Sequence, residues 1–223
     1  MRIDDPVSQR SWTPRSYDDR RTLGELHACL PGDAATDVPW YVRLLENPKS
    51  PVALAGAVDL FTHDCIHLVL GRGLLPQDEA FVLGFTMGTS AWCPGWHARL
   101  LGACARYLYR GSYRFSALDQ EVFHYAVAAG RTSQVLPLSD IDFASLFDQP
   151  LATVRTRIGL RRQWLDEIYE GERRRWPHTA ASRRLRIGFE PSPQDAVSCQ
   201  PRRAAVAASM PADTYGNHPA GWP

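Results

Sequence analysis

Two histidines and two acidic residues form a pattern that suits a metal ion. The chain reads His-Asp-Cys-Ile-His from His63 to His67, and Glu79 follows after eleven further residues. On a helix, His63 and His67 are one turn apart, so their imidazoles project from the same face. Asp64 lies at the edge of that face, and Glu79 can return from a following helix. Imidazoles and carboxylates suit zinc, or iron with open coordination positions, so we take these four residues as candidate ligands.

A structural role for the same residues stays open at this point. Histidines four positions apart occur by chance on many helix faces, and most such pairs bind nothing. Here the histidines and Asp64 interrupt an apolar stretch, where buried polar groups without partners cost several kcal/mol. A metal ion would satisfy all of them together.

The elements that must position these residues are expected to be helices. Apolar residues recur at helical spacing, and no long segment alternates with period two, which predicts an all-α bundle of about six to seven helices. The expected helices are residues 40–46, 51–70, 79–91, 96–110, 115–130, 148–159 and 161–176, with a further short helix at 22–29. Gly84 and Gly88 are four apart, a spacing that lets another helix approach closely.

Composition divides the chain into three parts. Residues 1–38 are polar and interrupted by prolines, which indicates an N-terminal extension. Residues 39–176 form the expected helical metal-binding domain. From residue 177 to 223, Pro, Ser, Ala, Gly and Arg dominate, which predicts a disordered tail.

The overall charge limits the partners. With 25 Lys and Arg against 24 Asp and Glu, the net charge is +1, so nucleic acid is not expected as a partner. Arginines crowd the last third of the chain; a solvated helix face is the usual reason, and an anionic partner or membrane surface is the alternative. Five cysteines without a Cys-x-x-Cys pair favour a reducing cytosol. No secretory signal and no membrane-spanning stretch is recognised, so we expect a cytoplasmic or peripheral protein.

The complete pattern resembles the signature of the coenzyme Q (ubiquinone) biosynthesis protein 4 family. The resemblance rests on His63-Asp64-x-x-His67, eleven residues, and Glu79. A second segment, PLATVRTRIGL at residues 150–160, is similar to the closing segment of that family, P-L-x-x-V-R-x-x-L-G-I. Together the similar stretches extend from about residue 40 to residue 160.

The resemblance implies an all-helical, peripheral membrane protein of ubiquinone biosynthesis that holds a divalent metal, usually taken as zinc. It implies that His63, Asp64, His67 and Glu79 are the metal ligands. It further implies either a lyase-like oxidative decarboxylation, in which the C1 carboxyl of a prenylated ring precursor is replaced by hydroxyl, or the organisation of other biosynthetic enzymes. Zinc has no redox role, so iron stays open for the oxidative reaction.

The expected partners follow from this resemblance. They are a prenylated quinone precursor or another lipid, the inner face of a membrane, other biosynthetic enzymes and a second copy of the chain. Arg155 is a candidate contact for an anionic head group. Phe85 is a candidate lining residue of a prenyl groove, although core packing is the commoner role at such a position.

Two other classes remain as alternatives. Adjacent His63 and Asp64 are also typical of HD-type metal phosphohydrolases, which need a further upstream His and a distant Asp; His27 and Asp119 are the residues available. The other alternative is a non-catalytic helical scaffold with a structural metal.

Overall fold

The structure is a computed structural model that describes residues 19–30, 50, 53–108 and 114–185. Within these residues the chain forms eight α-helices, six of them with seven residues or more, and no strand, so the all-α prediction is confirmed. The helices are α2 (Leu23–His27), α4 (Leu60–Leu70), α5 (Pro76–Thr89), α6 (Gly95–Tyr107), α7 (Ala117–Thr132), α8 (Leu151–Arg157), α9 (Arg162–Arg175) and α10 (Ala180–Arg184). None of the described helices combines the length and apolar composition that crossing a bilayer requires.

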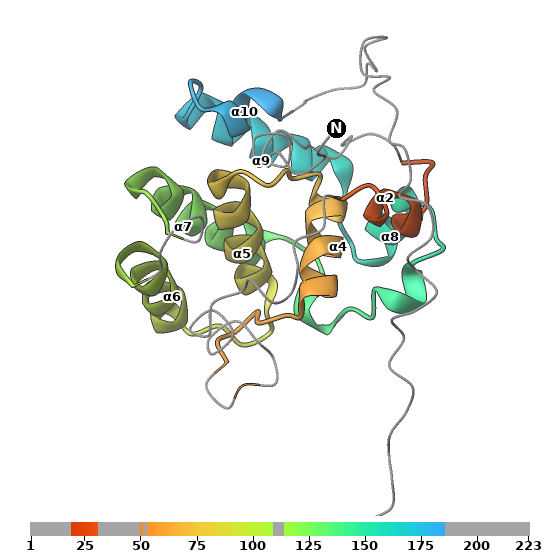
Figure 1. Cartoon of the computed structure of the whole chain (residues 1–223), viewed down its shortest axis with the longest axis horizontal. Coiled ribbons are helices and arrows are strands. Elements are labelled where there is room, and N and C mark those ends of the chain that lie inside the picture. Colours follow the sequence, from red (N-terminus) through yellow and green to blue (C-terminus); the bar gives the residue numbers. More distant parts are fainter. Residues whose placement is uncertain (1–18, 31–49, 51–52, 109–113, 186–223) are drawn as a thin grey trace, which may run out of the picture.

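The described helices pack around α4 and α5 (Figure 1). In Figure 1, α6 and α7 lie on one side of α5 and α4 lies on the other, with α2 and α8 beyond α4, while α9 and α10 lie across the top of the view. The larger apolar core lies among α4, α5, α7, α8 and α9. A second, smaller core lies between α6 and its neighbours. Helices α4 and α5, which carry the candidate ligands, therefore lie at the centre of the described helices.

Helices α5 and α7 touch through their backbones, as the spacing of Gly84 and Gly88 predicts. A Cβ atom at Gly84 would lie 2.4 Å from the carbonyl oxygen of Phe123. A Cβ at Gly88 would lie 2.4 Å from the carbonyl oxygen of Val127. Only glycine leaves room for this approach, so Gly84 and Gly88 determine how closely α5 packs against α7.

Helix α4 begins later than predicted. The expectation of a helix from residue 51 is wrong for residues 53–59, because the Asp59 carboxylate accepts a hydrogen bond from the Thr62 N–H at 2.7 Å and caps the helix there. Gly56, just before, has a φ of 80° and lies against the backbone of Met87, so the chain must turn. Helix α4 ends at Gly71, whose φ of 71° stops the helix.

Helix α5 begins earlier than predicted, at Pro76 rather than residue 79. Proline is favoured in the first turn of a helix, and the Asp78 carboxylate accepts a hydrogen bond from the Leu75 N–H at 3.2 Å. Glu79 therefore lies in the first turn of α5, only a short loop away from the end of α4.

The described parts of the two flanking segments, residues 19–30 and 177–185, pack on the helical domain. The short helix expected at residues 22–29 is confirmed as α2, and its Leu23 N–H donates to the Gln149 carbonyl at 3.0 Å. At the other end, α10 extends the helical part to Arg184, beyond the expected boundary at 176, and buried Ser182 holds it by accepting a hydrogen bond from Gln77 at 2.9 Å. The helix expected at 40–46 and the rest of the tail lie outside the described residues.

Candidate metal centre

His63, His67 and Glu79 meet at the junction of α4 and α5. His63 and His67 share one face of α4, and the turn from Gly71 to Leu75 brings Glu79 opposite them. Glu79 Oε2 lies 3.0 Å from His63 Nε2 and 3.3 Å from His67 Nε2. The two Nε2 atoms are 3.1 Å apart. These three residues form a group that could hold a metal ion.

Hydrogen bonds alone cannot satisfy this triangle of atoms. Each Nε2 carries at most one proton, and an ionised carboxylate oxygen only accepts. If both Nε2 atoms are protonated, the two N–H groups face each other across 3.1 Å. If only one is protonated, the lone pair of the other faces the lone pair of Glu79 Oε2. One contact is therefore repulsive in every tautomer, whereas a cation would attract all three lone pairs.

The spacing of the donor atoms also fits a shared metal. Ligand atoms lie about 2.0–2.2 Å from zinc, so neighbouring corners of a tetrahedron are about 3.4 Å apart. The observed separations of 3.0 to 3.3 Å are close to that edge. Two imidazoles with one carboxylate are also a donor set that zinc and iron accept.

One of the three residues is buried, and the other two are partly exposed to solvent. The side chain of His67 is 1% exposed, whereas those of His63 and Glu79 are 21% and 32% exposed. Burial alone would raise the pKa of the Glu79 carboxyl, but the neighbouring His67 and His63 outweigh burial and hold this pKa well below its usual range. Glu79 is thus an anion at neutral pH, as a metal ligand must be.

Asp64 lies outside the three-residue group. Its Oδ2 atom is 3.6 Å from Nε2 of His27, which comes from α2. The His27 ring itself packs against Phe61 and Phe147, with ring centroids 5.4 and 5.6 Å away. The structure therefore brings together three of the four predicted ligands, and the role of Asp64 as a ligand stays a prediction.

Cys65, within the motif, is not a ligand candidate. Its side chain is fully buried on another face of α4. Burial, then the nearby Asp64 and Asp59 carboxylates, raises the pKa of the Cys65 thiol far above its usual range. The thiol is therefore protonated and inert, as the helical geometry of the motif suggests.

A buried charged network, which the sequence reasoning missed, supports the junction from behind. Arg72 follows the cap of α4, and its backbone N–H donates to the His67 carbonyl at 2.9 Å. Its guanidinium pairs with Asp78, the residue before Glu79, at 3.4 Å and with Glu172 of α9. The sequence does contain a signal for this network. Arg72 and Asp78 interrupt the apolar segments of α4 and α5, and such charges are usually paired when buried.

The two predicted substrate residues lie in the interior. Arg155 is buried, where its Nε donates to the Val69 carbonyl at 2.8 Å and its Nη1 pairs with Asp19 at 2.7 Å. Phe85 is fully buried, with its ring 5.7 Å from that of Trp164. These contacts give both side chains a packing role; they do not support contact with a substrate, which stays a prediction.

The residue needed by the HD-type alternative is engaged elsewhere. Asp119 lies in the first turn of α7, where its carboxylate accepts a hydrogen bond from the Ser116 N–H at 2.9 Å. It is not a member of the metal group. His27 does lie beside Asp64, but His63 points to His67 and Glu79 instead.

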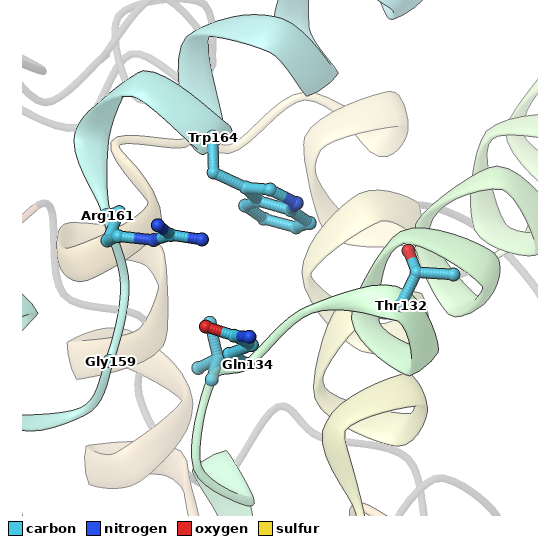
Figure 2. Close-up of a pocket in the computed structure, with 6 residues that line it drawn as sticks. Thr132, Gln134, Gly159, Arg161 and Trp164 are labelled. Atoms are coloured by element: carbon cyan, nitrogen blue, oxygen red, sulfur yellow. The ribbon is translucent and has the colours of Figure 1, made fainter.

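A separate hollow of about 100 Å³ lies where α7 ends and the turn between α8 and α9 passes (Figure 2). Arg161, Trp164 and Gln134 project into it. None of the three metal-group residues lines it. Its volume is below that of small-molecule sites, which usually exceed about 300 Å³.

No protein-family model matches the chain, and no curated protein or solved structure matches it.

Proposed function

We propose that His63, His67 and Glu79 bind a divalent metal ion, with zinc as the first candidate. The observation that carries this proposal is the closed triangle of donor atoms, in which each pair is 3.0 to 3.3 Å apart. Zinc is preferred over calcium or magnesium because imidazole nitrogen supplies two of the three donors. Iron remains the candidate for an oxidative reaction.

The geometry suits an open site. Three protein ligands are typical of catalytic zinc, whose remaining position takes water or substrate. A divalent metal bound here would supply Lewis-acid polarisation of a carboxylate or phenolate oxygen. Buried His67 anchors the site, while the exposed edges of His63 and Glu79 leave room for that oxygen.

We further propose a role in ubiquinone biosynthesis, acting on a prenylated ring precursor or organising the enzymes that do. This proposal rests on the resemblance of the His63–Glu79 pattern and of residues 150–160 to the coenzyme Q protein 4 family. An aryl carboxylate or phenolate is the kind of oxygen ligand that an open two-His, one-Glu site would take.

Metal analysis of the purified protein tests the site. We expect about one equivalent of metal in the wild type and loss of most of it in His63→Ala/His67→Ala. The matched control is His124→Ala/His178→Ala, which removes two exposed histidines outside the group. Equal metal content in the site variant and the control would contradict the assignment of His63 and His67 as ligands.

A quinone profile of the source organism tests the pathway. Deletion of the gene should lower the ubiquinone pool, and a decarboxylase role should also accumulate the ring acid. An unchanged pool would remove this chain from the pathway while leaving the metal site untouched.

A non-catalytic organiser is the second candidate. One observation favours it: the hollow in Figure 2 is small and none of the metal ligands lines it. A depleted ubiquinone pool without accumulated ring acid, restored by a metal-free variant, would select this reading.

A further inference from the structure

The hollow between the end of α7 and the start of α9 has a lining that suits an anion. Its volume is about 100 Å³, and its walls come from two short segments, residues 132–135 and 159–164. Figure 2 shows the guanidinium of Arg161 and the amide of Gln134 pointing into the space beside the indole of Trp164. No carboxylate lines this hollow.

Two groups of hydrogen-bond donors in the hollow have solvent as their only partner. Among the described residues, no acceptor pairs with the guanidinium of Arg161 or with the side-chain amide of Gln134. Thr132 differs, because its hydroxyl donates to the Ala128 carbonyl at 3.1 Å. A guanidinium carries five N–H donors and an amide carries two, so the hollow offers donors without a protein acceptor.

The walls of the hollow are held together by the backbone. The Leu136 N–H donates to the Ile158 carbonyl at 2.9 Å and joins the two segments. Next to this bond, Gly159 has a φ of 77°, and a Cβ there would lie 2.8 Å from the Gln134 carbonyl oxygen. The indole of Trp164 packs on a ring of α5, with the ring centroids 5.7 Å apart. The hollow is therefore formed before any ligand arrives, which lowers the cost of binding.

The two segments around the hollow are positively charged. Residues 122–139 and 149–165 contain five arginines and no Asp or Glu. Asp166, the next acid along the chain, lies 4.0 Å from Arg162, which Asp19 also contacts at 3.0 Å. These carboxylates serve Arg162, so the guanidinium inside the hollow keeps a charge that no described carboxylate balances.

We propose that this hollow binds one phosphate-sized oxyanion through the guanidinium of Arg161 and the side-chain amide of Gln134. The planar fork of a guanidinium matches two oxygens of a phosphate, and an amide N–H can donate to a third. A water molecule takes about 30 Å³, so the volume fits a small ion. The site goes beyond the proposed function, since none of its residues belongs to the metal group.

The oxyanion can come from two sources. It is either inorganic phosphate or the phosphoryl group at the end of a larger molecule. Both Arg161 and Gln134 are exposed, so the mouth of the hollow leaves room for the rest of such a molecule. The chemistry that recognises the phosphoryl oxygens is the same in both cases.

Other classes of ligand fit the hollow less well. A metal cation would meet a guanidinium and find no carboxylate or imidazole among the lining residues. An apolar ligand would remove water from Arg161 and Gln134 without replacing their hydrogen bonds, which is unfavourable. An anion with several acceptor oxygens avoids both penalties.

NMR spectra of the indole N–H groups test the proposal on the full ¹⁵N-labelled chain. The chain has seven tryptophans, and Trp164→Phe identifies the signal of Trp164. Inorganic phosphate is titrated at constant ionic strength. We expect a saturable shift of the Trp164 signal with a Kd of about 1 mM, because one guanidinium and one amide supply the binding.

Variants of the two donors test their roles. Arg161→Gln should weaken phosphate binding by about tenfold or more, and Gln134→Ala by about fivefold. Arg161→Lys should fall between Arg161→Gln and the wild type, because it keeps the charge but loses the fork. The matched control is Arg157→Gln, which removes an exposed arginine of the same acid-free segment that does not line the hollow. Circular dichroism melts establish that the variants are folded.

A second background separates this site from the metal group. Phosphate can also bind a metal ion, so the titration is repeated in His63→Ala/His67→Ala, where the shift of the Trp164 signal should persist. Phenyl phosphate, titrated in the same way, distinguishes the sources. Tighter binding of phenyl phosphate assigns the site to a phosphorylated ligand, and tighter binding of inorganic phosphate assigns it to the free ion.

Four outcomes overturn the proposal. These are no saturable shift in the wild type, an equal affinity in Arg161→Gln, an equal loss in Arg157→Gln, or loss of the shift in His63→Ala/His67→Ala. Because no candidate metal ligand lines the hollow, the first three results leave the proposed metal site untouched.

Discussion

The guanidinium of Arg72 pairs with the carboxylate of Glu172, one hundred positions further along the chain, and neither side chain is exposed to solvent. The guanidinium also lies 3.6 Å from the centre of the Phe81 ring and 4.5 Å from that of Tyr169. Gln77 completes the network with a 2.7 Å bond to Glu172. This pair connects α9 to the α4–α5 junction at which the candidate metal ligands meet.

Removal of one partner of this pair should be costly. Glu172→Gln leaves Arg72 charged and buried without its main counter-ion, and we expect unfolding free energy to fall by about 3–5 kcal/mol. Urea denaturation measures the change. Glu170→Gln, which removes the exposed partner of Arg174 in the same helix, is the control and should change stability by about 0–1 kcal/mol. Equal losses would mean that burial of the pair has no energetic role.

A single methyl group should disturb the contact between α5 and α7. Gly84→Ala places its Cβ 2.4 Å from a backbone oxygen, so a helix must shift, and we expect a loss of about 1–3 kcal/mol. Gly95→Ala is the matched control, because a Cβ there meets nothing within 4 Å. That variant should be neutral or slightly stabilising, since alanine favours helix. Thermal melts of the two variants compare them; a Gly84→Ala protein as stable as Gly95→Ala contradicts the close approach.

Metal binding should depend on Glu79 more than on Asp64. The carboxylate of Glu79 faces both imidazoles, whereas that of Asp64 faces His27 at 3.6 Å. We expect Glu79→Gln to lose most of the metal and Asp64→Asn to keep it, with affinity weakened by less than about tenfold, the lower end of the effect of an outer partner of the ligands. Competition with a chromogenic chelator gives both affinities. A loss in Asp64→Asn as large as in Glu79→Gln would make Asp64 the fourth ligand.

Chelation should destabilise only a protein with an intact site. A metal that binds the folded state raises stability by RT ln(1 + [L]/Kd), about 2.7 kcal/mol at one hundred times Kd. We therefore expect a chelator to lower the melting temperature of the wild type and to leave that of Glu79→Gln unchanged. Addition of zinc should restore the wild type. An identical shift in both proteins would show that the chelator acts elsewhere.

Among the described residues Cys65, Cys93 and Cys104 are free thiols, and they should differ in reactivity. Cys65 is buried and its pKa is raised far above the usual range, whereas Cys93 is partly exposed. At neutral pH we expect iodoacetamide to label Cys93 well before Cys65 in the native protein, and both in urea. Mass spectrometry of tryptic peptides reads out the order. Rapid native labelling of Cys65 would contradict the buried, protonated thiol.

The helices and the core of the site follow from local pattern, so the sequence predicts them. His63 and His67 share a face because of helical spacing, and Gly84 with Gly88 signals the approach of α7. The sequence predicts the ends of the helices less well than their existence. The Asp59 cap competes with an apolar run that continues back to residue 53, and a short polar side chain decides where the helix starts.

Relations between distant segments could not be predicted from spacing. Nothing local marks Glu172 as the partner of Arg72, because the pairing depends on how α9 crosses the hairpin. The contact of Asp64 with His27 likewise depends on how α2 packs against α4, two helices that are distant in the sequence. Such pairs are set by the global fold, and periodicity does not encode them.

The positive φ of Gly71 has a consequence for the order of folding. By ending α4 abruptly, it lets the chain return at once, so His63 and Glu79 meet although only sixteen positions separate them. Closing so short a loop costs little entropy and takes well under a microsecond for about ten residues. The Arg72–Glu172 pair, with a separation of one hundred, must wait for the rest of the chain. The metal donors can therefore gather in a nascent hairpin, and the arrival of α9 locks them in place.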